Sequence, residues 1–182
     1  MNEHLPVDKT FKLFIGGAFP RSESGRTFAV RDAKGALLAN ASQASRKDLR
    51  EAVRAARGAQ ESWAGRTAYN RGQILYRVAE IMEARRPEFV AVLRQIGVTP
   101  KAAGKQVDQA IDRWVWYAGW ADKTHHVLGT VNPVSGPYFN FTFPEPTGVV
   151  GVMAPDQPAL LGLVSRLAPV IVSGNTAVAV IE

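Results

Sequence analysis

The sequence has no cysteine at any of its 182 positions. This absence excludes disulfides, thiolate metal sites and a cysteine nucleophile from these residues. The chain also has no apolar run close to the roughly 20 residues that a helix needs to span a bilayer. Residues 1–9 carry acidic side chains and no apolar stretch, so no secretory signal is visible and we expect a cytoplasmic protein without membrane contact.

The chain has no large excess of charge of one sign. It has 22 Lys and Arg against 16 Asp and Glu, a formal net charge of +6, which does not by itself indicate a nucleic-acid partner. Arginines at positions 46, 50, 54 and 57 fall on one face of a helix. They either bind nucleic acid or form a solvated face, and we expect the solvated face.

The first part of the chain predicts a small sheet followed by helices. Three short apolar segments between glycine turns predict an antiparallel meander: residues 11–15, 26–30 and 37–41. Ser45 with Asp48 three residues later is a capping-box signal for the first helix. Apolar spacing predicts three more helices, with Ile81 and Val92 among the inward residues. They begin near positions 70, 87 and 102.

Two groups of residues have both a functional and a structural interpretation. An aromatic cluster could stack on a ligand, but its helical spacing is more typical of a core or an interface. Its members are Trp114, Trp116, Tyr117 and Trp120. His125 and His126 could serve metal binding or acid–base chemistry, but adjacent side chains point apart on most backbones. We therefore expect a solvated loop over residues 124–137 and no metal site.

The pattern changes to strands after this loop. Residues 138–143 alternate strictly, which places Phe139, Phe141 and Phe143 on one side of a strand. A one-sided aromatic strand outside a complete sheet needs cover. Contact with another subunit by strand addition and an ordinary covered strand are both open interpretations.

The C-terminal residues predict a β-α-β unit. Residues 148–153 form a continuous apolar run typical of a strand buried on both faces. An apolar helix over 158–171 and a strand over 176–181 follow, so the two strands should be parallel with a right-handed crossover. Two strands do not complete a layer. We therefore expect either a fragment or a subunit that borrows the missing half.

Four segments, in this order and spacing, resemble the aldehyde dehydrogenase family. They are Leu13–Gly17 (LFIGG), Tyr117–Lys123 (YAGWADK), Glu145–Gly151 (EPTGVVG) and Leu167–Thr176 (LAPVIVSGNT). The resemblance implies an α/β fold, the N-terminal part of an aldehyde dehydrogenase-like fold. It assigns a strand meander and helical segment to residues 1–131, an oligomerisation-type β ribbon to 132–146, and the first β-α-β of an incomplete dinucleotide-binding domain to 147–182.

The chain departs from the family pattern at the position of an oxyanion donor. The resemblance implies Pro-Trp-Asn after the GVVG strand, with the Asn amide donating to the oxyanion. Here Pro155 is followed by Asp156 and Gln157. Such a donor is worth about 3–4 kcal/mol in related acyl chemistry, and the longer Gln side chain displaces the amide by roughly an ångström, which can cost about 100-fold in rate. Gln157 is either this degraded oxyanion position or an ordinary polar residue at a helix start. Asp156 is either catalytic or, as we expect, a helix N-cap.

A second departure concerns the cofactor. The resemblance implies NAD or NADP, a cofactor cleft lined at the positions of Ala154 and Pro155, and a Lys that reaches the adenosine ribose. That Lys position is Val180 here, which cannot donate a hydrogen bond. We therefore expect weaker binding of NAD or NADP, and the alternative is that the chain binds neither.

Two functions remain open. The resemblance implies oxidation of an aldehyde to an acid, but the family's catalytic Cys and general-base Glu lie beyond the matched region, so we expect this chain to be inactive alone. The alternative is a pseudoenzyme or scaffold subunit. Under either, residues 132–146 would join a second copy or a full-length aldehyde dehydrogenase relative.

Overall fold

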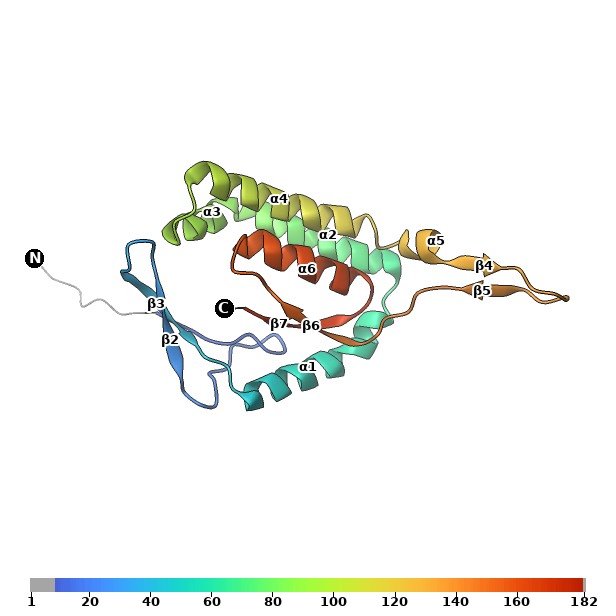
Figure 1. Ribbon diagram of the computed structural model, residues 1–182, viewed down its shortest axis with the longest axis horizontal. Coiled ribbons are helices and arrows are strands. Elements are labelled where there is room, and N and C mark those ends of the chain that lie inside the picture. The colour runs from blue at the N-terminus through green and yellow to red at the C-terminus, as the bar shows by residue number, and fades with distance from the viewer. Residues whose placement is uncertain (1–8, 182) are drawn as a thin grey trace, which may run out of the picture.

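A computed structural model describes residues 9–181 and confirms an α/β architecture (Figure 1). A layer of helices packs against a short parallel sheet, a small separate sheet lies near the N-terminus, and a hairpin projects from the opposite end. The prediction that residues 1–9 hold no secretory signal concerns positions almost wholly outside the described range. Within residues 9–181, no helix combines the length and the apolar character that a membrane span requires.

The N-terminal sheet contains β1 (Thr10–Phe11), β2 (Thr27–Arg31) and β3 (Leu37–Ser42), in the order β1-β3-β2. The predicted antiparallel meander is wrong for β1, which pairs with β3 in parallel, while β2 and β3 are antiparallel. After β1 the chain makes its own tight turn, with backbone bonds between Ile15 and Ala18, and so does not return beside β1. β2 therefore occupies the far edge of β3.

Helix α1 (Arg46–Ala64) begins at the predicted capping box. The Ser45 hydroxyl accepts from the backbone N–H of Asp48, at 3.2 Å, and the Asp48 carboxylate accepts from the backbone N–H of Ser45, at 2.7 Å. Asp48 also accepts from the hydroxyl of Ser22, at 2.6 Å. The cap thereby fixes the loop after β1 to the start of α1.

Helices α2 (Ala68–Ala84), α3 (Arg86–Gln95) and α4 (Pro100–Ala118) form the main layer, as predicted. Their core includes Leu75, Leu93, Val107, Ala110 and Trp114. Gly72 lets α2 and α4 approach closely, because a Cβ there would lie 2.9 Å from a carbonyl oxygen of α4. Ile81 and Val92, predicted inward, are instead 47% and 58% exposed, since they lie at the margin of the stripe that faces α4.

The loop predicted for residues 124–137 is wrong in its first half. It contains α5 (Thr124–Leu128) and β4 (Thr130–Asn132), and β4 pairs antiparallel with β5 (Asn140–Thr142). The sequence pattern could not predict β4, because three residues are too few to show the alternation of a strand before its pairing partner is known. The resulting β4–β5 hairpin extends away from the body of the molecule (Figure 1).

The predicted β-α-β unit is confirmed as β6 (Val149–Met153), α6 (Ala159–Val172) and β7 (Thr176–Val180). The strands are parallel, with Val149 opposite Thr176 and Met153 opposite Val180. Helix α6 covers one face of this sheet and α1 the other (Figure 1). Strand β6 is less buried than predicted, since Met153 at its end is 65% exposed.

Candidate functional site

The carboxyl ends of β6 and β7 lie side by side and define the candidate site. Because the strands are parallel and in register, Met153 and Val180 end at the same edge, and the backbone N–H of Ala154 donates to the carbonyl of Val180 at 3.0 Å. Ligands of open α/β sheets bind outside the carboxyl ends of the strands. The structure thus brings together Ala154 and Val180, which the sequence assigned to one cofactor cleft.

The exit loop, residues 154–158, leaves β6 and leads into α6. Ala154 and Pro155 are half-buried, whereas Asp156 and Gln157 are exposed. The ring of Pro155 lies directly on Gly162 of α6, where a Cβ would come within 2.3 Å of the Pro155 Cγ atom. Only glycine therefore fits at position 162 with the loop in this place.

Asp156 does not cap α6, so that prediction is wrong. The cap residue is Pro158, and no side chain of the loop accepts a hydrogen bond from the helix start. Gln157 likewise forms no side-chain hydrogen bond within residues 9–181, and it is exposed at the sheet edge. This leaves the amide available to a ligand and leaves both interpretations of Gln157 open.

The N-terminus of α6 is capped from another helix instead. The side-chain oxygen of Gln106, on α4, accepts from the backbone N–H of Leu160 at 3.0 Å. Sequence reasoning missed this contact. The available signal was a polar residue on the inward stripe of α4, beside Val107 and one turn from Ala103 and Ala110.

Side chains from two further helices hold the C-terminus of α6. The indole N–H of Trp63, on α1, donates to the carbonyl of Ile171 at 2.9 Å. The guanidinium of Arg71, on α2, donates through Nε to the carbonyl of Val172 at 3.1 Å, and burial lowers the pKa of Arg71. The start of α6 is therefore bonded to α4, and its end to α1 and α2.

Asn175 joins the starts of the two strands. Its side-chain oxygen accepts from the backbone N–H of Gly148, at 2.8 Å, and from the hydroxyl of Thr147, at 3.2 Å. Its amide donates to the hydroxyl of Ser173. The residue is only 8% exposed, so this network explains why a short polar turn precedes β7.

An apolar hollow of about 320 Å³ lies between α1 and the sheet. Leu49 and Val53 of α1 line it on one side, and Val178 and Val180 on the other. Val180 is 42% exposed but offers no donor, so the residues present do not fit recognition of ribose hydroxyls by a side chain at this position. They fit only an apolar wall beside a bound nucleotide.

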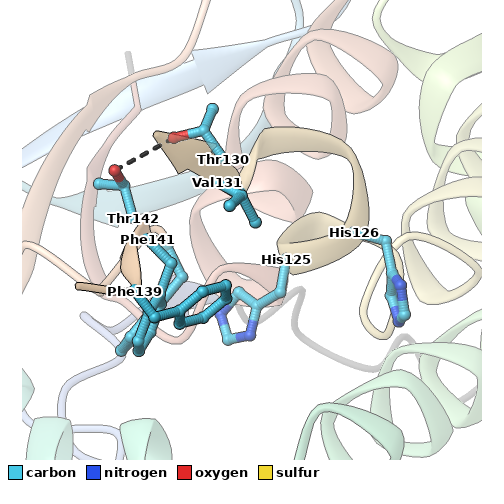
Figure 2. A pocket seen from close by; sticks show the side chains of 9 residues that line it. His125, His126, Thr130, Val131, Phe139, Phe141 and Thr142 are labelled. Carbon is cyan, nitrogen blue, oxygen red and sulfur yellow. Dashed lines mark hydrogen bonds between the residues drawn. The ribbon is translucent and has the colours of Figure 1, made fainter. Parts of the chain in front are cut away.

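The hairpin carries a second hollow, of about 390 Å³, at its base (Figure 2). Phe139 and Phe141 have ring centroids 5.4 Å apart, and those of Phe141 and Phe143 are 5.9 Å apart, so the predicted gathering of the three rings is confirmed. The strand predicted over residues 138–143 is shorter, because only Asn140–Thr142 pair with β4. The three rings are 74%, 55% and 48% exposed. Figure 2 shows His125 turned towards them and His126 turned away, and His125 packs on Phe143 at 5.6 Å.

The aromatic residues around Trp114 pack against the core or against one another. Trp114 lies in the core, whereas Trp116 is 55% exposed and packs on Tyr117 and Trp120. Between residues 9 and 181, no group of three or more His, Asp or Glu side chains is placed to hold a metal ion. Among the described residues, the candidate sites are therefore the carboxyl edge of β6 and β7 and the β4–β5 hairpin.

Comparison with known proteins gives matches over almost the whole chain. The family model "Aldehyde dehydrogenase family" matches residues 19–180. Retinal dehydrogenase 2 of Homo sapiens is 36% identical over 176 residues, which cover 93% of this chain and 33% of that protein. A putative aldehyde dehydrogenase of Bacillus subtilis (strain 168) is 34% identical, with coverage of 93% and 34%.

Solved structures agree. The NAD⁺ complex of an aldehyde dehydrogenase from Bacillus cereus superposes with a TM-score of 0.87 at 30% identity, over 94% of this chain and 35% of that one. A salicylaldehyde dehydrogenase from Pseudomonas putida G7, complexed with salicylaldehyde, gives 0.89 at 25% identity, over 95% and 36%. The chain thus spans about a third of the length of the relatives that it matches.

Proposed function

This chain belongs to the aldehyde dehydrogenase family, and from that premise we propose that it contributes the N-terminal part of an enzyme that oxidises an aldehyde to an acid with NAD or NADP. The expected fold, the N-terminal part of an aldehyde dehydrogenase-like fold, is confirmed by the structural matches. We keep the proposed division into residues 1–131, 132–146 and 147–182, with the last segment as the start of a dinucleotide-binding domain.

The main support for this proposal is the position of the exit loop at the carboxyl edge of the sheet. Attack of a nucleophile on an aldehyde carbonyl places negative charge on its oxygen, and a donor aimed at that oxygen lowers the barrier. Gln157 offers an exposed side-chain amide at the carboxyl edge of the parallel strands. The chain has no cysteine, so a thiol nucleophile has to come from polypeptide outside these 182 residues.

The cofactor would lie against Ala154, Pro155 and Val180. A bound NAD or NADP would supply a hydride acceptor for the aldehyde carbon. The described residues contribute shape and apolar contact to this wall, and Val180 contributes no hydrogen bond. Affinity for the cofactor then depends on groups outside the described residues.

A second candidate is a pseudoenzyme or scaffold subunit. Asp156 adds an exposed carboxylate directly beside Gln157, which opposes a developing anion. Together with the longer side chain of Gln157 and the apolar Val180, this charge favours loss of chemistry with retention of architecture. Such a subunit would assemble through residues 132–146 with a second copy or with a full-length aldehyde dehydrogenase relative.

Aldehyde-dependent NADH formation by the longest natural form of the protein separates the two candidates. The enzyme proposal expects turnover, and it expects Gln157→Ala to lower kcat about 10- to 100-fold, because the oxyanion loses a donor. Asp156→Asn is the matched control and should raise kcat or leave it unchanged, since it removes only the opposing charge. Absence of turnover with a range of aldehydes and both cofactors would contradict the enzyme proposal and favour the scaffold.

A further inference from the structure

The start of α6 has no local cap. Helix α6 begins at Ala159 with Pro158 as its cap residue, and Pro158 provides no side-chain acceptor. The first N–H groups of a helix have no partner within the helix, and an uncapped start typically costs about 1 kcal/mol. Asp156, the acceptor that lies close by in the sequence, makes no such bond.

Gln106 supplies the missing acceptor from 54 residues earlier in the chain. Its side chain is 9% exposed and accepts from Leu160 at 3.0 Å. The surrounding α4 residues, Ala103, Val107 and Ala110, are fully buried. Because close packing permits few alternative rotamers, Gln106 is held in one place and acts as a fixed point for the helix start.

The exit loop is the segment that this fixed point controls. At one end, Ala154 is bonded to Val180 and Pro155 is seated on Gly162. At the other end, Leu160 is bonded to Gln106. Asp156 and Gln157 lie between these two anchors with no hydrogen bond of their own to the body within residues 9–181. The place of Gln157 is therefore determined by its anchors.

We propose that Gln106 is a positioning residue that sets the location of Gln157 at the carboxyl edge of the sheet. It touches no reacting atom and acts only through the exit loop. The effect of Gln106 on catalysis rests on the function proposed above, whereas its restraint of the exit loop does not. A displacement of about 1 Å at an active site can lower a rate about 100-fold.

Amide hydrogen exchange in the 182-residue chain tests whether Gln106 restrains the exit loop. Gln106→Met removes the acceptor at nearly constant volume, and Gln106→Asn keeps an amide that is one methylene too short to reach. Both should speed exchange at Leu160 roughly fivefold to tenfold, whereas Gln106→Glu, which keeps an acceptor at the same reach, should preserve protection. Gln109→Met, on the exposed face of α4, is the matched control and should leave Leu160 unchanged.

Unchanged exchange at Leu160 in a folded Gln106→Met or Gln106→Asn protein would overturn the proposal. If Gln106→Met does not fold, the Asn and Glu variants still give opposite expectations for Leu160. Their comparison therefore decides the outcome without it.

Turnover by the longest natural form tests whether Gln106 acts through Gln157. Gln106→Met should lower kcat more than it changes KM, Gln106→Glu should restore most of the loss, and the double variant Gln106→Met/Gln157→Ala should be no slower than Gln157→Ala alone. Additive losses would overturn the positioning role. A wild-type protein without turnover would contradict the proposed function instead, and the exchange result at Leu160 alone would then decide whether Gln106 holds the loop.

Discussion

Asp48 shows how a single charged residue can hold together parts of the fold that are distant in sequence. Its carboxylate accepts from the hydroxyl of Ser22 and from the backbone N–H groups of Glu23 and Ser45. These bonds, that of Ser22 first, lower the pKa of Asp48 from 3.8 to about 2. The charged form is therefore favoured more strongly in the folded chain than in the unfolded one.

We therefore predict that the free energy of unfolding falls at acidic pH. The contribution of Asp48 is fully present above its unfolded pKa of 3.8 and is lost as the pH falls towards about 2. Asp48→Asn should lower the free energy of unfolding at pH 7 by about 1–2 kcal/mol and flatten the acid limb of a urea-denaturation series. Asp112→Asn, at an exposed position of α4 with no side-chain hydrogen bond among residues 9–181, is the control. An acid limb as steep in Asp48→Asn as in the wild type would show that other carboxyl groups dominate.

At the scale of elements, the close contact between the exit loop and α6 gives a second prediction. Gly162→Ala would place a methyl group 2.3 Å from the Pro155 ring, so the loop or the helix must move. We expect a loss of about 1–3 kcal/mol in unfolding free energy and faster amide exchange at Ala154, whose N–H donates to the carbonyl of Val180 beside the displaced loop. Gly151→Ala, which meets no atom within 4 Å, should be much milder. Equal effects of the two substitutions would indicate that only glycine flexibility matters.

Local signals predicted the elements better than their connections. Ser45 with Asp48 and the proline at position 87 marked helix starts, because capping and first-turn preferences act within a few residues. The parallel pairing of β1 with β3 was not predictable in this way, since it depends on where a distant segment returns. The same holds for the site. The sequence indicated Gln157 and Val180 by resemblance, but the acceptor at Gln106 belongs to a contact between layers that no local pattern encodes.

At the scale of the whole molecule, the β4–β5 hairpin projects an exposed aromatic face away from the body (Figure 1). Burying such a face against a second copy would remove apolar area from water. We predict that the chain self-associates and that Phe141→Ser raises the dissociation constant at least about tenfold, measured by sedimentation velocity over a concentration series. Tyr76→Ser, on α2 outside residues 132–146 and 51% exposed against 55% for Phe141, is the control. A wild-type chain that stays monomeric, and that does not bind a full-length relative, would contradict assembly through residues 132–146.

We propose that the carboxyl ends of β6 and β7 form one wall of a dinucleotide site. Calorimetric titration of NAD⁺ and NADH into the longest natural form of the protein tests it most directly. We expect dissociation constants between micromolar and low millimolar, and tighter binding in Val180→Lys, because a donor then reaches the ribose hydroxyls. No detectable binding of either nucleotide, in the wild type and in Val180→Lys alike, would contradict it and leave the dinucleotide fold as architecture alone.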